Sequence, residues 1–209
     1  SMTGRCREKN VMPGTRGIMA KVNAILGYDF TPRLVDLWSD DQAVAKEARH
    51  IYRGACSQVL DQSYYSRLSQ FCRQHNLLLT GHPAKPDDIR ALSHFDIPGQ
   101  DLVWRWVLPD EPTALEGGDS TQAKCASSAM IHAGKRRNLN ECCGAYGHEL
   151  TWDEMLWLAN WAIVRGCNMI VPHAFYYSVR GCRYDERPPD VGPSAPWWPD
   201  YKTYADTVS

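Results

Sequence analysis

The chain has 209 residues, of which 44% are hydrophobic and 22% are charged, with a formal net charge of −1 at pH 7. This length is sufficient for one substantial hydrophobic core. The near-neutral charge excludes the basic surface that attracts nucleic acids or anionic membranes, and no apolar run is long enough to span a bilayer. We therefore expect a soluble globular protein with neither nucleic acid nor a membrane as its partner.

The N-terminal third is predicted to be helical after an irregular arm at residues 1–17. A short helix is predicted at 18–26, ending at Gly27, and a second at 31–38, with Thr31 as N-cap and a proline in its first turn. Apolar residues then recur with a 3.6-residue period from 44 to 72, which indicates one long amphipathic helix.

The remainder alternates short apolar runs with helical patterns. We predict four strands at 77–80, 94–97, 138–141 and 168–173, the second of them stopped by Pro98-Gly99. Helices are predicted between them: one starting near 86–88, one at 120–133, and one from the capping box of Thr151 and Glu154 to about 165.

Strands alternating with helices indicate βαβ units and a parallel sheet. Such a sheet is either doubly wound or part of a (β/α)₈ barrel, and no glycine-rich nucleotide-binding motif supports the first. Four strands cannot close an eight-stranded barrel. The predicted fold is therefore α/β, a partial (β/α)₈ TIM-type barrel over 18–209 with about four parallel strands and flanking helices.

Polar and aromatic residues gather where the predicted strands end. In parallel α/β folds these C-terminal strand ends surround the active site. The residues in question are His82, Asp101, Asn140 with Glu141, and His173 with Tyr176 and Tyr177.

Glu141 is the strongest candidate for a catalytic carboxylate. Small residues follow it and would let a ligand approach the backbone. Glycoside hydrolysis uses one carboxyl as an acid and a second as base or nucleophile. The alternative is a structural Glu paired with Arg136 or Arg137. The second carboxyl stays open between a residue outside this chain and several within it: Asp29, Asp96, Asp101, Asp185 and Glu186.

Eight Trp and ten Tyr are the unusual part of the composition. Most such rings fill cores, but they also stack on the apolar faces of sugars. The loop tryptophans are lids or sugar-stacking platforms: Trp104, Trp106, Trp197 and Trp198. The eight Cys contain no C-x-x-C and no zinc-site spacing, which favours a reducing, cytoplasmic compartment over secretion.

Five short segments, in this order and spacing, resemble the bacterial α-L-rhamnosidase-like glycoside hydrolases: Gly27-Tyr28-Asp29-Phe30, Leu79-Thr80-Gly81-His82, Asp96-Ile97-Pro98-Gly99-Gln100-Asp101, Asn140-Glu141-Cys142-Cys143-Gly144-Ala145-Tyr146-Gly147 and Val171-Pro172-His173-Ala174-Phe175-Tyr176-Tyr177-Ser178. The resemblance implies a (β/α)₈ catalytic domain with Glu141 as acid or base. It also implies that His82 and His173 bind the sugar. Further predicted substrate contacts are Asp101, Trp104, Asn140, Tyr146, Tyr176, Tyr177 and Glu186.

Members of this family carry an Asp-Glu-Pro segment at an earlier strand end, and their last barrel strands would follow Ser209. The resemblance therefore predicts a fragment of a larger bacterial enzyme, with open sheet edges that a homo-oligomer would cover. Some members use calcium at the site, so calcium is the one cofactor that the resemblance admits. The chain has no calcium loop of the EF-hand type.

Three functions follow as hypotheses. The first is hydrolysis of an O-glycosidic bond in a carbohydrate substrate by Glu141. The second is a non-catalytic carbohydrate-binding or oligomerising half-barrel. The third, a nucleotide-dependent α/β enzyme, is disfavoured because no phosphate-binding loop is present.

Overall fold

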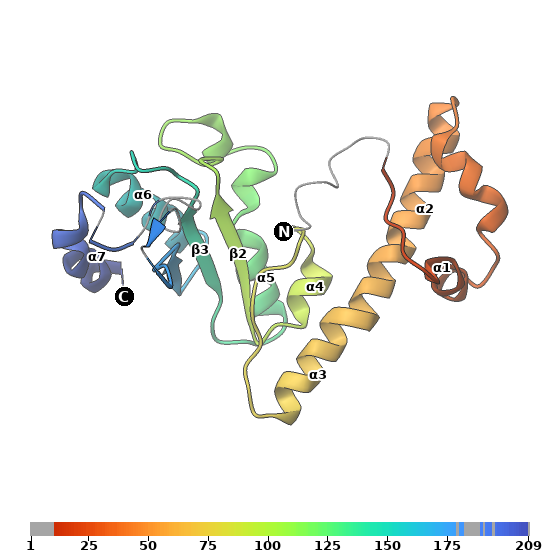
Figure 1. Ribbon diagram of the computed structural model, residues 1–209, viewed down its shortest axis with the longest axis horizontal. Coiled ribbons are helices and arrows are strands. Elements are labelled where there is room, and N and C mark those ends of the chain that lie inside the picture. Colours follow the sequence, from red (N-terminus) through yellow and green to blue (C-terminus); the bar gives the residue numbers. More distant parts are fainter. Residues whose placement is uncertain (1–10, 179, 182–188, 190, 194, 209) are drawn as a thin grey trace. The chain divides into compact units, whose positions relative to one another are not determined.

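The computed structural model describes residues 11–178, 180–181, 189, 191–193 and 195–208, which form two compact units, 1–74 and 75–209 (Figure 1). The boundary at Gln74 and His75 falls inside the single barrel domain predicted for 18–209. That the two units make up one domain stays a prediction, and each is described by itself.

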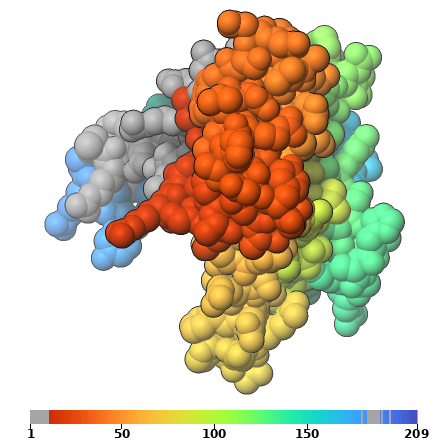
Figure 2. Space-filling view, turned by 90° about the vertical axis from the view of Figure 1, so that its right-hand side faces the viewer, coloured from red at the N-terminus to blue at the C-terminus, as the bar shows by residue number. Residues whose placement is uncertain are grey.

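The N-terminal unit is helical, and Figure 2 shows its surface from one side. Its buried centre is formed by apolar side chains from several helices, among them Val22, Phe30 and Tyr52. In chain order the elements are α1 (Ile18–Leu26), the 3₁₀-helix η1 (Thr31–Trp38), α2 (Gln42–Leu60), the π-helical turn η2 (Asp61–Tyr65) and α3 (Ser66–Gln74).

The predicted helix ends of this unit are partly confirmed. Gly27 ends α1 with φ of 76°, a left-handed conformation that glycine adopts without steric cost. The predicted helix at 31–38 is confirmed as the 3₁₀-helix η1, but Thr31 is not its N-cap. Phe30 precedes the element, and its carbonyl accepts a hydrogen bond from the Arg33 N–H at 2.9 Å. The long amphipathic helix is confirmed over α2 to α3, with η2 inserted between them.

The C-terminal unit is built on a four-stranded, all-parallel sheet in the order β1-β2-β3-β4. Its strands are β1 (Thr80–Gly81), β2 (Ile97–Val103), β3 (Leu139–Gly144) and β4 (Ile170–Pro172). Its helices are α4 (Ile89–Ser93), α5 (Lys124–His132), α6 (Trp152–Ile163) and α7 (Tyr201–Val208), with short 3₁₀ turns η3 (Pro112–Ala114), η4 (Asp119–Thr121) and η6 (Trp198–Asp200).

Helices α4 and α5 pack on β2, and α6 packs on β3 (Figure 1). The predicted α/β class, with four parallel strands and flanking helices, is therefore confirmed, and the arrangement is that of part of a (β/α)-barrel. Among the described residues, no helix combines the length and the apolar character needed to cross a bilayer. The cysteines in the described ranges are free thiols: Cys56, Cys72, Cys125, Cys142, Cys143 and Cys167.

The first two strands differ from their predicted positions. Leu77 and Leu78 are 55% and 70% exposed, so the apolar run at 77–80 is not a buried strand, and only its last residue lies in β1. The second strand begins at Ile97, where it was predicted to end. Pro98 is the register partner of Gly81 in β1, and pairing with β3 starts only at the next residue, so the proline lies outside the β2–β3 ladder.

Steric contacts explain why a glycine stands at position 99 of β2. A Cβ atom at this position would lie 2.6 Å from the carbonyl oxygen of Gly81 and 2.8 Å from the side chain of Leu139. Only glycine lets the neighbouring strands approach so closely, so Pro98-Gly99 marks tight strand packing and not the turn that the sequence suggested.

Alternate residues of β2 and β3 face opposite sides of the sheet. Leu102 and Cys142 are register partners on the helix-covered side, where both are fully buried with Met155 and Leu158 of α6. Gln100 faces the same side, because its Oε1 accepts a hydrogen bond from the Ala126 N–H in α5. The other side of the sheet carries the residues between these positions.

Candidate active site

Three ionisable side chains meet on the side of the sheet opposite the helices. Asp101 of β2 and Glu141 of β3 are register partners, and His82 follows directly after β1. The Nε2 atom of His82 lies 3.3 Å from Oε2 of Glu141 and 3.9 Å from Oδ2 of Asp101. The three side chains are 27–37% exposed, so they are accessible to a ligand.

The contact between the imidazole and the carboxylates shifts two pKa values in opposite directions. The hydrogen bond with Glu141 raises the pKa of His82, against the opposing effect of burial, and the charge of Asp101 adds to the rise. The same hydrogen bond lowers the pKa of Glu141, again against burial, and the charges of His82 and then His173 add smaller contributions. The cluster therefore favours an imidazolium beside an ionised Glu141.

His173 lies at the end of β4 on the same side as Glu141. Its backbone N–H donates to the Cys142 carbonyl at 2.8 Å, which continues the pairing of β3 with β4. Its Nδ1 atom is buried and has no hydrogen-bond partner among the described residues. The Tyr176 ring packs edge-on against the imidazole at 6.2 Å, while Tyr177 is fully exposed.

An exposed indole lies at the exit of β2. Trp104 is 52% exposed, and its backbone N–H donates to the Gly144 carbonyl at 2.9 Å. Gly144 is three residues past Glu141, and Trp104 is three residues past Asp101. The indole is therefore attached at the strand edge where both carboxylate-bearing strands end.

Two of the predicted substrate-binding residues are corrected. Tyr146 has no exposed surface, and its hydroxyl donates to the Val107 carbonyl at 2.7 Å, so it is a core residue. Asn140 is also fully buried, because the alternation of β3 turns its side chain to the helix-covered side, opposite Glu141. Both predictions followed chain position alone, which does not reveal the direction of a side chain.

The tryptophan and loop predictions had mixed outcomes. Trp197 is 6% exposed and its Nε1–H donates to the Leu150 carbonyl, so it is not a stacking platform. Trp198 is half-buried and stacks on Tyr201. Glu186 lies outside the described residues. Of the remaining candidates, six are brought to the same strand edge: His82, Asp101, Trp104, Glu141, His173 and Tyr176.

Two features of the site were not predicted from sequence. One is that His82 contacts both carboxylates, because residues 19 and 59 positions away meet it only once the strands are paired. The other is Arg105, whose guanidinium binds Glu154 and the Tyr146 carbonyl. The sequence hints at a role for Arg105 only through its position directly after Trp104, in a predicted loop.

The described residues do not suit the calcium that the resemblance admitted. Within the described ranges, no group of three or more His, Cys, Asp or Glu side chains is arranged to hold a metal ion. Calcium takes six to eight oxygen ligands, whereas this cluster supplies two carboxylates and an imidazole. The chemistry derived below uses side chains alone.

Comparison with known proteins shows a relationship at the level of structure. No protein-family model matches the chain, and no curated protein matches it significantly in sequence. A rhamnosidase from Novosphingobium sp. PP1Y superposes with a TM-score of 0.55 at 18% sequence identity, over 77% of this chain and 16% of that chain. The chain therefore has a rhamnosidase-like, glycoside hydrolase-like fold and spans about a sixth of that rhamnosidase's length.

Proposed function

We propose that this site hydrolyses O-glycosidic bonds of rhamnoside-type substrates, with Glu141 and Asp101 as its two carboxyl groups. One observation carries the proposal: on adjacent strands, both carboxylates face the exposed side of the sheet and lie within 3.9 Å of the same His82 nitrogen. Two juxtaposed carboxyls are what glycoside hydrolysis requires. The similarity of the fold to a rhamnosidase supports this class of substrate.

The electrostatics suggest a division of roles. Because His82 lowers the pKa of Glu141, that carboxyl favours its ionised form, which acts as general base or nucleophile. Asp101 is then the carboxyl that protonates the leaving oxygen. His82 lies within reach of both carboxyls, and its imidazolium offsets the negative charge of Glu141.

The test is hydrolysis of 4-nitrophenyl α-L-rhamnoside by the chain and its Glu141→Gln variant. We expect the substitution to lower kcat at least about 100-fold, the usual contribution of a general acid or base. Circular dichroism of both proteins shows whether the fold is retained.

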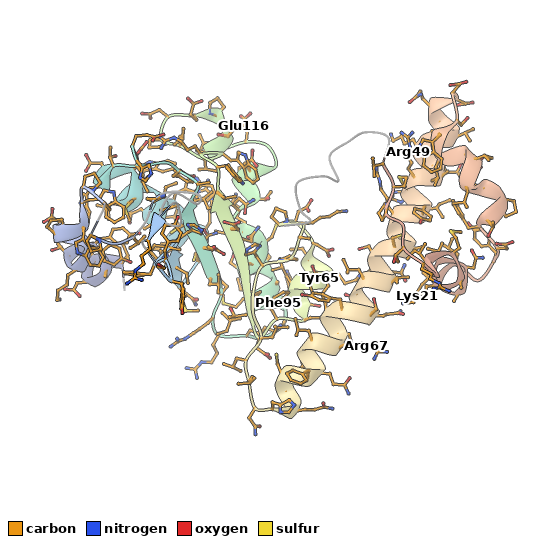
Figure 3. The ribbon with its side chains drawn as sticks, viewed as in Figure 1. Lys21, Arg49, Tyr65, Arg67, Phe95 and Glu116 are labelled. Carbon is orange, nitrogen blue, oxygen red and sulfur yellow. The ribbon has the colours of Figure 1, made fainter. Side chains whose placement is uncertain are left out.

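Glu116→Gln is the matched control, because Glu116 is exposed (Figure 3). It lies two residues past Ala114, whose carbonyl accepts hydrogen bonds from Trp161 and Arg165 at the C-terminal end of α6. Neither of these hydrogen bonds involves a residue of the site. Unchanged activity in this control attributes the loss to Glu141.

Two outcomes contradict the proposal. If Glu141→Gln keeps the parent activity, Glu141 is not a catalytic carboxyl. If the chain binds rhamnosides without cleaving them, the second hypothesis replaces the first, and the unit is a carbohydrate-binding module. The homo-oligomer expected to cover the sheet edges stays a prediction, which sedimentation velocity tests.

A further inference from the structure

The backbone immediately after β2 adopts an unfavourable conformation. Trp104 and Arg105 have φ values of 62° and 52°, although neither is a glycine. A side chain beyond Cα makes this left-handed region costly, and two such residues in succession are uncommon. Conformations of this kind persist only where surrounding contacts enforce them, and they occur often at ligand-binding sites.

The Trp106 N–H donates to the Val103 carbonyl at 3.3 Å, which closes a β-turn with Trp104 and Arg105 at its centre. The Arg105 side chain connects this turn to the rest of the unit. One guanidinium nitrogen donates to the Tyr146 carbonyl at 3.0 Å, and another donates to Oε1 of Glu154 at 2.6 Å. The guanidinium also lies over the Tyr146 ring, 5.6 Å from its centroid. These charge-assisted, partly buried bonds connect the exit of β2 to the loop after β3 and to the first turn of α6.

Glu154 is itself held rigidly. It is the third residue of α6 and completes the capping box, in which its Oε2 accepts a bond from the Thr151 backbone N–H at 3.0 Å. One carboxylate oxygen thus caps the helix while the other binds Arg105. Arg105 is therefore fixed to a helix terminus and not to a mobile side chain.

The hydrogen bonds of Arg105 hold the segment of backbone that carries the Trp104 indole. The Trp104 backbone N–H donates to the Gly144 carbonyl, while the residue as a whole is 52% exposed. A large apolar ring that is displayed in this way at the edge of a carboxylate cluster offers a stacking surface to a bound ring.

We propose that Arg105 is a positioning residue, which fixes Trp104 as the stacking platform for a second ring with an apolar face, linked to the rhamnoside that the site holds. This inference rests on the proposed function and specifies its substrate class. The second ring is an aryl aglycone or another sugar, which share the apolar face that an indole recognises.

The experiment measures equilibrium binding by calorimetry in the Glu141→Gln background, where turnover is suppressed. The probes are methyl α-L-rhamnoside, which lacks a second ring, 4-nitrophenyl α-L-rhamnoside, and a methyl rhamnosyl-glucoside. We expect Trp104→Ala to weaken binding of a two-ring probe roughly 2- to 12-fold, the usual worth of ring stacking, with methyl rhamnoside unaffected. If Trp104→Ala weakens binding of the aryl probe alone, the second ring is an aryl aglycone. If it weakens binding of the disaccharide alone, the second ring is a sugar.

Two further variants separate positioning from general stability. Arg105→Met keeps the length of the side chain but removes its hydrogen bonds, and we expect the same selective loss as for Trp104→Ala. Trp104→Phe retains a ring and should restore most of the affinity for the two-ring probe. A merely structural role of Arg105 would instead weaken all three probes alike.

The outcomes distinguish the two proposals. If methyl rhamnoside binds but Trp104→Ala leaves the two-ring affinities unchanged, the platform is overturned and the proposed function stands. If Trp104→Ala acts as expected but Arg105→Met weakens no probe or all three equally, the positioning role of Arg105 is overturned. If none of the probes binds, the proposed function itself fails, and this inference with it.

Discussion

The two sides of the sheet place neighbouring residues of one strand in opposite environments. Asn140 and Glu141 are adjacent in β3 and both are polar, yet Asn140 is fully buried while the Glu141 side chain is 33% exposed. The covered side packs against α5 and α6, and the other side gathers His82 and the two carboxylates. Residue type therefore does not identify a site residue in this sheet; the side on which the residue lies does.

Register partners on β2 and β3 show the same contrast between the two sides of the sheet. Gln100 pairs with Asn140 on the covered side, and Asp101 pairs with Glu141 on the open side. The Gln100 amide has its partners within the fold, the Ala126 N–H and the Pro86 carbonyl, whereas the exposed carboxylates can exchange theirs for a ligand. Variants at matched positions on the two sides can break or sharpen this contrast.

The largest expected effect comes from removing a core side chain. Leu102→Ala should lower the free energy of unfolding by about 2–5 kcal/mol, because Leu102 is fully buried in the main core cluster. Val171→Ala is the matched control on the open side, where Val171 is 40% exposed, and should cost less than about 1 kcal/mol. Urea denaturation measures both. Equal losses would show that the open side is covered in solution.

An intermediate effect is expected from the buried amides. Gln100→Leu should cost roughly 1–3 kcal/mol, because it leaves the Ala126 N–H and the Pro86 carbonyl without their partner. Asn140→Leu should be close to neutral or stabilising, since neither amide atom of Asn140 has a hydrogen-bond partner among the described residues. Thermal unfolding compares the two. A comparable loss for Asn140→Leu would indicate that a buried water binds this amide.

The smallest effect concerns the ion pair on the open side. The raised pKa of His82 contributes stability that is full below the ordinary value of 6.5 and is lost as pH rises through the folded value. The lowered pKa of Glu141 contributes stability that is full above 4.5 and is lost as pH falls through its folded value. The two contributions coincide between 4.5 and 6.5.

We therefore expect His82→Gln to destabilise the protein most within that window, by less than about 1 kcal/mol because the side chains are about one-third exposed. Unfolding midpoints measured from pH 4 to pH 9 in roughly unit steps would show the difference from the parent shrinking toward alkaline pH. A difference that is constant over the whole range would mean that the imidazole stabilises by packing and not by charge.

The sequence by itself determined the local structure where short-range chemistry decides. Gly27 ends α1, and Thr151 with Glu154 forms the capping box of α6, because these features depend only on residues within one turn. The alternation of strands and helices also gave the parallel sheet and placed His82, Asp101 and Glu141 at its edge.

Only the tertiary structure decided which of the polar residues face one another. Pro98-Gly99 reads locally as a turn, but contacts with Gly81 and Leu139 make it part of β2. Asn140 and Tyr146 were indistinguishable from site residues until strand register and burial assigned them to the core. Arg105 gained its role from Glu154, 49 residues away. Register and long-range contacts arise from the packing of whole elements, so no local pattern in the sequence encodes them.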